Sequence, residues 1–411
     1  DTVDRRAGKV RRVRVEHTTS VPVPMSEMVL GGDVESVAGE LREVIEGYGG
    51  SADWLTPILA PYRPGATVAG SFRETVEKLF AGFDLLVTDA ADPALKLVSL
   101  PVLLGEAEHA AEHERALLDA TRQLEAAGYA GQVAVLPDAA NLFWHGPAGR
   151  ERLHRAGDGW EAKEARRRFT HAELMDEIRA TPGAFSPNVF LRPVVESSVF
   201  PTLAYVAGPG ETAYFAQIRP LFQAFGIRMP IVFPRMSAVL VPEEADAALA
   251  EAGLAVDDLK PPVHEIVERI ARERVPQDVR DRLTALRAGI VDGYAGLIEA
   301  AQEVDPNLSA ALGAARNRAL LGAGDAERKI LRHLKRRDGE LTQAVELAKA
   351  HLYPNGVPQE RLLNIFPYLA ANGPDLLRDL AAQADVGLET TASTAVTTPA
   401  VTTPAVTTPA G

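Results

Sequence analysis

The amino-acid sequence predicts an α/β protein that contains a parallel sheet and a long helical hairpin. A short apolar run at residues 83–89 closes on an acidic turn, which is typical of a buried strand in a doubly wound sheet. Between residues 263 and 352 the apolar side chains recur at spacings of three and four, which indicates amphipathic helices. A chain of 411 residues is long enough for about two or three domains.

The first third of the chain predicts alternating strands and helices. The alternation in residues 9–15 suggests a strand, and because a strand needs partners, we expect the chain to start in mid-domain. The following elements are expected to be helices at 34–48 and 68–80, the buried strand at 83–89, a long polar helix at 106–127 and a strand at 132–136.

The middle of the chain predicts a β-rich insert and then the heart of the protein. Residues 137–168 contain two glycine-bounded turns, at 146–149 and 157–159, and a helix is expected at 171–180. The segment 185–235 alternates strand-like runs with glycine and proline turns. We therefore expect the active-site segment there.

Two apolar stripes predict a coiled-coil hairpin in residues 263–352, with its turn at Asp305-Pro306. Such helices would bury their seam against each other, the core or another subunit. Two ordinary amphipathic helices of one domain are the alternative. The stripes consist of Val279, Leu283, Leu286, Ile290, Tyr294, Leu297 and Ala301, and of Ile330, Leu334, Leu341, Val345, Ala348 and Leu352.

The chain ends in repeats of Val-Thr-Thr-Pro-Ala, which offer nothing to bury, so we expect disorder there. The predicted domain organisation is a partial α/β core with a helical insert at 1–136, a small β-rich insert at 137–168, a central core at 169–262, a helical hairpin at 263–352, a C-terminal core segment at 353–384 and the disordered tail at 385–411.

Composition restricts the function. The chain has 43 basic and 56 acidic side chains, and its net charge of −13 argues against nucleic-acid binding, which needs a net basic face. The absence of cysteine excludes disulfides, zinc–thiolate sites and a cysteine nucleophile. No run approaches the ~20 apolar residues of a membrane span, and no apolar signal stretch begins the sequence. We therefore expect a cytoplasmic protein that binds neither membranes nor nucleic acid.

The sequence His109-Ala-Ala-Glu112-His113 matches a zinc-peptidase pattern, in which two histidines one helical turn apart hold the metal and a glutamate acts as the base. The stretch around it is rich in Glu and His, so a solvated helix explains the same residues. We favour the solvated helix and predict no bound metal.

Asn188 and Arg192 lie close together around a predicted strand, and a fixed arginine can clamp a carboxylate or phosphate. Downstream, residues 203–206 run into Gly208-Pro209-Gly210, where a ligand could approach the backbone at a helix N-terminus. Glu211, Tyr214 and Gln217 follow at spacings that could line one site. A tight strand-to-helix connection, with Glu211 complementing the helix dipole, is an equally good interpretation.

Two more polar clusters lie further along the chain. Gln359, Glu360 and Arg361 precede an apolar helix, where they form either a ligand site or a helix cap with an ion pair. A basic patch could meet nucleotide phosphates or a partner, although a solvated face of the hairpin is favoured. The patch consists of Lys329, Arg332, His333, Lys335, Arg336 and Arg337.

Three long segments, in this order, carry a resemblance to a known family: FSPNVFLRPVVESSVFPTLAYVAGPGETAYFAQIRPLF, GIRMPIVFPR and HLYPNGVPQERLLN. Together they resemble the BshC family, the cysteine-adding enzymes of the bacillithiol pathway, over about residues 8 to 380. The resemblance implies a Rossmann-like core with connecting inserts, and a coiled-coil domain through which members form homodimers. The family pattern begins with further residues, including a Gly-Gln-Gln and a Glu-Asp-His-Asp segment, so the N-terminal part of the core is expected to be missing. Glu196-Ser197 also replaces the usual Gln-Asp pair.

The resemblance further implies a ligase that attaches L-cysteine to the amine of glucosaminyl-malate, the last step of bacillithiol biosynthesis. Its carboxyl activation would use ATP or another nucleotide. Arg192 and Arg235 would hold carboxylate or phosphate groups, and Glu211, Tyr214 and Gln217 would be the catalytic residues that orient the amine or sugar. The other expected binding residues are Asn188, Tyr205, Gly208, Gly210, Gln359, Glu360, Arg361 and Asn364. The alternative is a truncated, non-catalytic family member that acts as a coiled-coil dimerisation protein.

Overall fold

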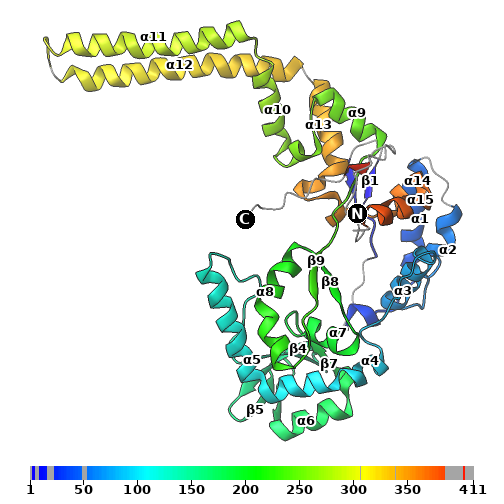
Figure 1. Ribbon diagram of the computed structural model, residues 1–411. Helices are drawn as coiled ribbons and strands as arrows, with labels where there is room; N and C mark the ends of the chain where they lie inside the picture. Colours follow the sequence, from blue (N-terminus) through cyan, green and yellow to red (C-terminus); the bar gives the residue numbers. More distant parts are fainter. Residues whose placement is uncertain are drawn as a thin grey trace, which may run out of the picture. The chain divides into compact units, whose positions relative to one another are not determined.

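The computed structural model describes residues 2–4, 9–15, 23–48, 53–305, 307–337, 339–384 and 401–402, which form two compact units (Figure 1). Unit 1 comprises Asp1–Val13, Glu43–Gly50 and Ser237–Gly411, and unit 2 comprises Arg14–Arg42 and Ser51–Met236. The predicted disordered tail lies outside the described residues except for Val401–Thr402, which form strand β11.

Unit 2 combines helices with a five-stranded antiparallel sheet and a separate parallel pair of strands. Its helices are the N-terminal part of α1 (Asp33–Gly47), α2 (Thr56–Leu59), α3 (Val68–Leu79), α4 (Pro93–Val98), α5 (Leu100–Ala126), α6 (His171–Ala180), α7 (Arg192–Val199) and α8 (Pro209–Ala224). Its strands are β3 (Ala139–Gly146), β4 (Gly149–Ala156), β5 (Gly159–Ala162), β6 (Arg167–Thr170), β7 (Phe185–Pro187), β8 (Ala204–Ala207) and β9 (Ile231–Pro234). Three short 3-10 turns, Met25–Glu27, Asp53–Leu55 and Pro182–Ala184, complete it.

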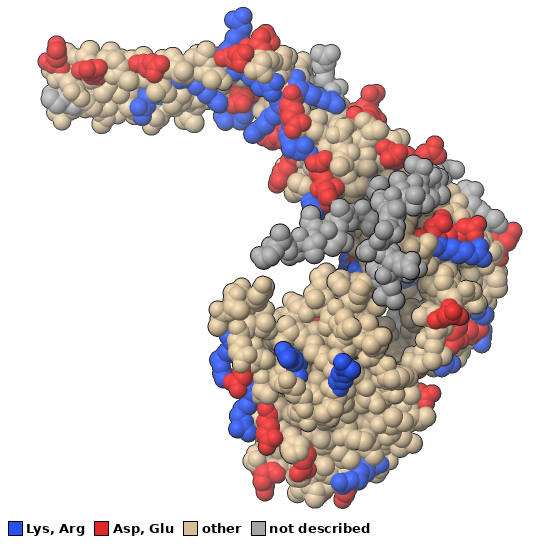
Figure 2. Space-filling model, viewed as in Figure 1, with Lys and Arg blue, Asp and Glu red and all other residues tan. Residues whose placement is uncertain are grey.

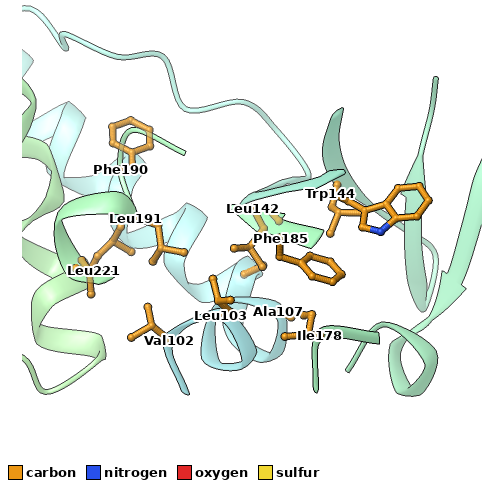
Figure 3. Packing of buried hydrophobic residues seen from close by; sticks show 14 of the residues in the cluster. Val102, Leu103, Ala107, Leu142, Trp144, Ile178, Phe185, Phe190, Leu191 and Leu221 are labelled. Carbon is orange, nitrogen blue, oxygen red and sulfur yellow. The ribbon is translucent and has the colours of Figure 1, made fainter. Parts of the chain in front are cut away.

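The five-stranded sheet, in the order β6-β5-β4-β3-β7, supplies one wall of the core of unit 2. Side chains alternate between its two faces, and the buried face carries Trp144, Trp160 and Phe185. Figure 3 shows Leu142 and Phe185 of this sheet facing Leu103 and Ala107 of α5. The strands predicted in residues 137–168 are therefore confirmed, and their inner face is part of the main core.

Helix α5 is the central helix of unit 2, although the sequence predicted a polar helix. It bends at His109, whose backbone leaves the helical region (Figure 1). The carboxylate of Glu106 is fully buried, where Oε1 accepts a hydrogen bond from Asn141 N (2.8 Å) and Oε2 lies 2.7 Å from His113 Nδ1. These contacts join α5 to β3, since a buried carboxylate must find partners.

Two strands predicted in unit 2 are wrong. Residues 83–89 form no strand, because they pair with none of the described strands, and Leu86 is 82% exposed. Residues 132–136 are also irregular, since the side chain of Gln217 binds the backbone of Val133 where a neighbouring strand would. The predicted strand around Arg192 is short as well, because β7 ends at Pro187 and Arg192 begins α7.

Strands β8 and β9 are connected through α8 and pair in parallel, so they form one β-α-β unit. Ala204 lies opposite Ile231 and Ala207 lies opposite Pro234. This unit confirms the predicted strand, glycine turn and helix, with the strand shifted by one residue to Ala204–Ala207. Val206 and Ile231 of this two-stranded sheet are exposed, as is Leu203 directly before β8.

Unit 1 is mostly helical, and none of the helices described in the chain is long and apolar enough to cross a membrane. Its elements are β1 (Thr2–Asp4), β2 (Lys9–Arg11), the end of α1, β10 (Val239–Leu240), β11, α9 (Glu243–Ala252), α10 (Val263–Glu273), α11 (Gln277–Ala301), α12 (Leu308–Arg337), α13 (Gly339–Leu352), α14 (Phe366–Asn372), α15 (Asp375–Ala384) and the 3-10 turns Val256–Leu259, Pro354–Gly356 and Gln359–Arg361.

The hairpin predicted from the two stripes is confirmed for α11 and α12, which lie side by side (Figure 1). The second stripe does not continue along this hairpin, because a new helix, α13, begins at Gly339. Leu341, Val345 and Leu352 of α13 pack with α9 and α10 in a separate core. Of the proposed basic patch, Lys335, Arg336 and Arg337 have side chains outside the described residues.

We predict that Glu106→Ala lowers the free energy of unfolding by about 3 kcal/mol, because it leaves Asn141 N and the His113 ring without their buried partner. Chemical denaturation measures this loss. The matched control is Glu108→Ala, which removes an exposed carboxylate paired with His171 and should cost at most about 1 kcal/mol. Equal effects of the two variants would contradict the buried role of Glu106.

Candidate functional site

The carboxyl edge of the β8–β9 pair brings together several residues that the sequence singled out. Gly208 follows β8 and caps α8, and Arg235 follows β9. The two segments are held side by side, because Arg235 N donates to Ala207 O at 2.8 Å. In parallel α/β sheets this edge is where ligands bind, since loops and helix N-termini gather there.

Arg192, Tyr205 and Tyr214 form an interacting group with Glu196. Arg192 Nε donates to Glu196 Oε1 (2.7 Å), and this contact raises the pKa of the Arg192 guanidinium. The phenols of Tyr205 and Tyr214 are close enough to influence each other's pKa. Burial is the main cause that raises the pKa of both phenols, and the Glu196 carboxylate raises them further. Both tyrosines are therefore neutral hydrogen-bonding groups near neutral pH.

Glu211 stabilises the turn before α8. Its Oε2 accepts a hydrogen bond from Gly208 N (2.8 Å), so the acid binds back to the start of its own helix. Thr212 Oγ1 donates to Gly208 O (3.0 Å) and fixes the same turn. Gly208 has an ordinary extended backbone (φ −72°), and an added Cβ at Gly210 would meet only Gln132 at 3.8 Å. The space at Gly210 is thus open to a ligand. The contact between Glu211 and Gly208 N also agrees with the alternative interpretation, in which Glu211 stabilises the first turn of α8.

Gln217 is fully buried and its amide is engaged by protein groups. Its Oε1 accepts from Val133 N (3.0 Å), and its Nε2 donates to Val133 O (3.1 Å) and Thr121 Oγ1 (2.9 Å). These bonds connect α8 to α5 and to Val133. Although Gln217 is one helical turn from Tyr214, both of its amide hydrogens already have acceptors.

Asn188 is buried and organises the turn before α7. Its Oδ1 accepts from Phe190 N (2.9 Å) and Leu191 N (3.0 Å), while its Nδ2 donates to Asn141 Oδ1 (2.8 Å). Asn188 therefore fixes the backbone that presents Arg192, four residues later.

The remaining candidates, in residues 359–364, belong to unit 1. Gln359 is buried, and its Oε1 accepts from Leu240 N (2.8 Å) while its Nε2 donates to Leu240 O (2.7 Å) and His351 O (2.8 Å). Asn364 Oδ1 accepts from Phe366 N at 2.8 Å. Glu360 and Arg361 are exposed, with 3.5 Å between Arg361 Nε and Glu360 Oε1.

The two histidines of the zinc-peptidase pattern, His109 and His113, lie in different surroundings and do not form a metal site. The His113 ring is buried against Phe225 and holds Glu106 through Nδ1, whereas His109 is exposed at the bend of α5. Across the described part of the chain, no three His, Asp or Glu side chains are grouped as metal ligands.

Sequence reasoning missed Glu196, which the structure places as the partner of Arg192. The signal was their spacing of four residues, which makes an ion pair on a helix but not on the strand that we predicted. A groove of about 550 Å³ between α5 and α8 contains none of the predicted site residues.

We predict that unit 2 loses stability as the pH rises above the ordinary tyrosine pKa of 10.0, because the folded state favours the neutral forms of Tyr205 and Tyr214. This contribution is complete below pH 10.0 and is lost as the pH approaches the raised folded values. Denaturation curves between about pH 9 and 11 should show a smaller decrease for Tyr205→Phe. Tyr129→Phe, at a ring that is 69% exposed, should behave like the wild type, and an equal decrease in all three proteins would refute the assignment.

Comparisons with known proteins agree with the division at residue 236. Residues 2–236 match the family model described as the bacillithiol biosynthesis BshC N-terminal Rossmann-like domain, and residues 238–388 match the corresponding C-terminal coiled-coil domain.

Three relatives, each named "Putative cysteine ligase BshC", extend the similarity. The Koribacter versatilis protein is 30% identical over 375 residues, which cover 91% of this chain and 69% of the relative. The Solibacter usitatus protein is 34% identical over 337 residues, covering 82% and 63%. The Chlorobaculum tepidum protein is 31% identical over 388 residues, covering 91% and 69%. The chain thus spans roughly two thirds of the length of these relatives, and it belongs to the BshC family of bacillithiol biosynthesis.

Proposed function

We propose that this chain acts as a cytoplasmic ligase that joins the carboxyl group of L-cysteine to the amine of glucosaminyl-malate, in the last step of bacillithiol biosynthesis. The names of the family models and of the relatives support this reaction class. The observation that carries the proposal is the carboxyl edge of β8–β9, where Gly208 and Arg235 lie side by side. ATP or another nucleotide would supply the activation that an amide bond requires.

The turn at Gly208–Gly210 has features that favour an anionic ligand and one feature that opposes it. A helix leaves the amide groups of its first turn without helical acceptors, and Gly210 adds open space beside them. The Glu211 carboxylate already neutralises some of this positive potential through Gly208 N. The positive charges of Arg192 and Arg235 therefore have to complete the site, by binding carboxylate or phosphate oxygens.

The tyrosines and acids have separate roles in this proposal. Tyr205 and Tyr214 remain protonated, so they donate hydrogen bonds to substrate oxygens and do not accept protons from the amine. The carboxylates nearest to them, Glu196 and Glu211, are the candidates to receive the amine proton. Gln217 and Asn188 act as positioning residues, while Glu360, Arg361, Gln359 and Asn364 stay predicted binding residues of unit 1.

We also propose a homodimer formed through the hairpin. The visible face of α11 and α12 is largely uncharged (Figure 2), and Leu286 and Leu297 are about half exposed. A shallow groove of about 470 Å³ follows α11 and is lined by Ala285, Leu286, Gly289, Ile290, Gly293, Tyr294 and Leu297. Its glycines and alanine allow a second helix to approach closely, which suits packing against another copy.

The proposed reaction is tested by incubating the purified chain with glucosaminyl-malate, L-cysteine and ATP. Mass spectrometry should detect the cysteinyl conjugate above a no-enzyme control. If a folded, dimeric chain forms no conjugate with ATP, GTP or CTP, the ligase proposal fails for this chain. The non-catalytic dimerisation role would then be the better proposal.

We predict that Arg192→Ala lowers kcat/KM by about 10- to 100-fold, because one or two charge-assisted hydrogen bonds to the substrate are lost. Arg179→Ala is the matched control, since Arg179 forms a similar helical ion pair with Asp176 far from this turn in sequence. Unchanged kinetics for Arg192→Ala would remove the clamp from the proposal.

We predict that Leu286→Glu converts the dimer to monomers, because it places a charge in the exposed apolar stripe. Thr284→Glu changes a polar position nearly opposite on the same helix and should leave the dimer intact. Analytical ultracentrifugation measures both masses. A monomeric wild type would dispose of the dimer proposal.

A further inference from the structure

Four basic side chains gather near the outer face of the five-stranded sheet, opposite the core of unit 2. We call Lys96, His145, Arg150 and Arg152 the outer-face cluster. The last three come from β3 and β4, where His145 lies opposite Arg150 and Phe143 opposite Arg152. Lys96 reaches the sheet from α4, with its Nζ donating to Phe185 O (2.7 Å).

The cluster is held in place by uncharged groups. Arg150 Cζ lies 3.7 Å and Arg152 Cζ lies 4.7 Å from the centroid of the Phe143 ring, so one ring supports both guanidinium groups. Ser186 Oγ accepts from Arg150 Nε (2.9 Å) and lies 2.9 Å from His145 Nε2. Arg152 Nη1 donates to Ala140 O at 3.2 Å.

The positive charges of the cluster lack matching carboxylates. Among the residues that the structure describes, no salt bridge joins Lys96, Arg150 or Arg152 to an acid. The carboxylates that raise pKa values in the cluster are Glu27, which acts on His145, and Asp89, which acts on Lys96. By contrast, Arg168 on the same sheet is paired with Glu161 at 3.2 Å.

Mutual repulsion adds to the cost of this arrangement. Burial lowers the pKa of Lys96, His145 and Arg152, and the charge of Arg150 lowers each of them further. His145 is therefore neutral near pH 7, so the Ser186 hydroxyl can donate to its Nε2 while accepting from Arg150. Lys96 and Arg152 are partly buried beside the exposed Arg150, and positive charges that destabilise one another in this way indicate a site that binds an anion.

We propose that the outer-face cluster binds a dianionic phosphate group, either free or carried by a small phosphate ester. Arg150 and Arg152 keep guanidinium N–H groups that no described residue accepts, and these match the oxygens of a phosphate. Because both guanidinium groups lie against the ring of Phe143, their positive charges are close to each other. A tetrahedral phosphate carries its charge at one centre, whereas a dicarboxylate spreads it over two.

The test is a binding measurement on the whole chain, and it does not depend on the ligase reaction. Inorganic phosphate, glucose 6-phosphate and succinate are each titrated into the protein in chloride buffer, by calorimetry and by thermal shift. We expect phosphate to bind the wild type and raise its Tm, and Arg150→Gln and Arg152→Gln to weaken the apparent Kd by about 10-fold or more. Arg168→Gln, at the paired arginine of the same sheet, should bind like the wild type.

Each outcome of this test has one meaning. Phosphate and glucose 6-phosphate binding alike assigns the site to phosphate esters, and binding of phosphate alone assigns it to the free ion. Binding that is equal in the wild type and in both cluster variants overturns the proposal, as does succinate binding at least as tightly as phosphate. An absence of any binding by the wild type overturns it too. If Arg150→Gln does not fold, Arg152→Gln alone decides between these outcomes.

Discussion

The structure depends on two glutamine side chains that pair with backbone as a β-strand would. Gln217 closes both hydrogen bonds to Val133 and thereby fixes α8, the helix that begins at the glycine turn. Gln359 does the same to Leu240 and fastens the segment after α13 to β10. Each amide satisfies a backbone donor and a backbone acceptor, those of Val133 in an irregular segment and those of Leu240 in β10, and both residues are partly buried.

In the candidate site, some polar side chains position their neighbours, while others have atoms available to contact a ligand. Asn188 and Gln217 form hydrogen bonds with backbone groups and neighbouring side chains, so they determine where Arg192 and Tyr214 lie. Glu211 caps its own helix and is in addition a proposed proton acceptor. Arg192 and the two tyrosines keep polar atoms near the edge of β8–β9. An ion pair within one helix, Arg192 with Glu196, sets the charge of the group while leaving part of the guanidinium for a ligand.

Local patterns predicted the helices, the β-insert and the hairpin, because each is encoded by periodicity or turn residues within a few positions. These local patterns failed where contacts between residues distant in the sequence determine the local structure. Residues 83–89 looked like a buried strand, but no described strand lies beside them. The hydrogen bonds between Gln217 and Val133, 84 residues away, also leave no local trace in the sequence, so the structural role of this predicted site residue could not be predicted. The long second arm was predicted as one helix because α12 and α13 share a periodicity, although they pack on different neighbours.

The buried face of the sheet has a spectroscopic consequence. All three tryptophans of the sequence, Trp54, Trp144 and Trp160, lie in unit 2, and the latter two are enclosed by its core. Indole fluorescence therefore reports the packing of the Rossmann-like domain alone. The helical hairpin and its neighbours contribute most of the backbone ellipticity of unit 1 without contributing to that emission. Tryptophan emission thus follows the unfolding of unit 2 alone, whereas the backbone ellipticity follows the helices of both units.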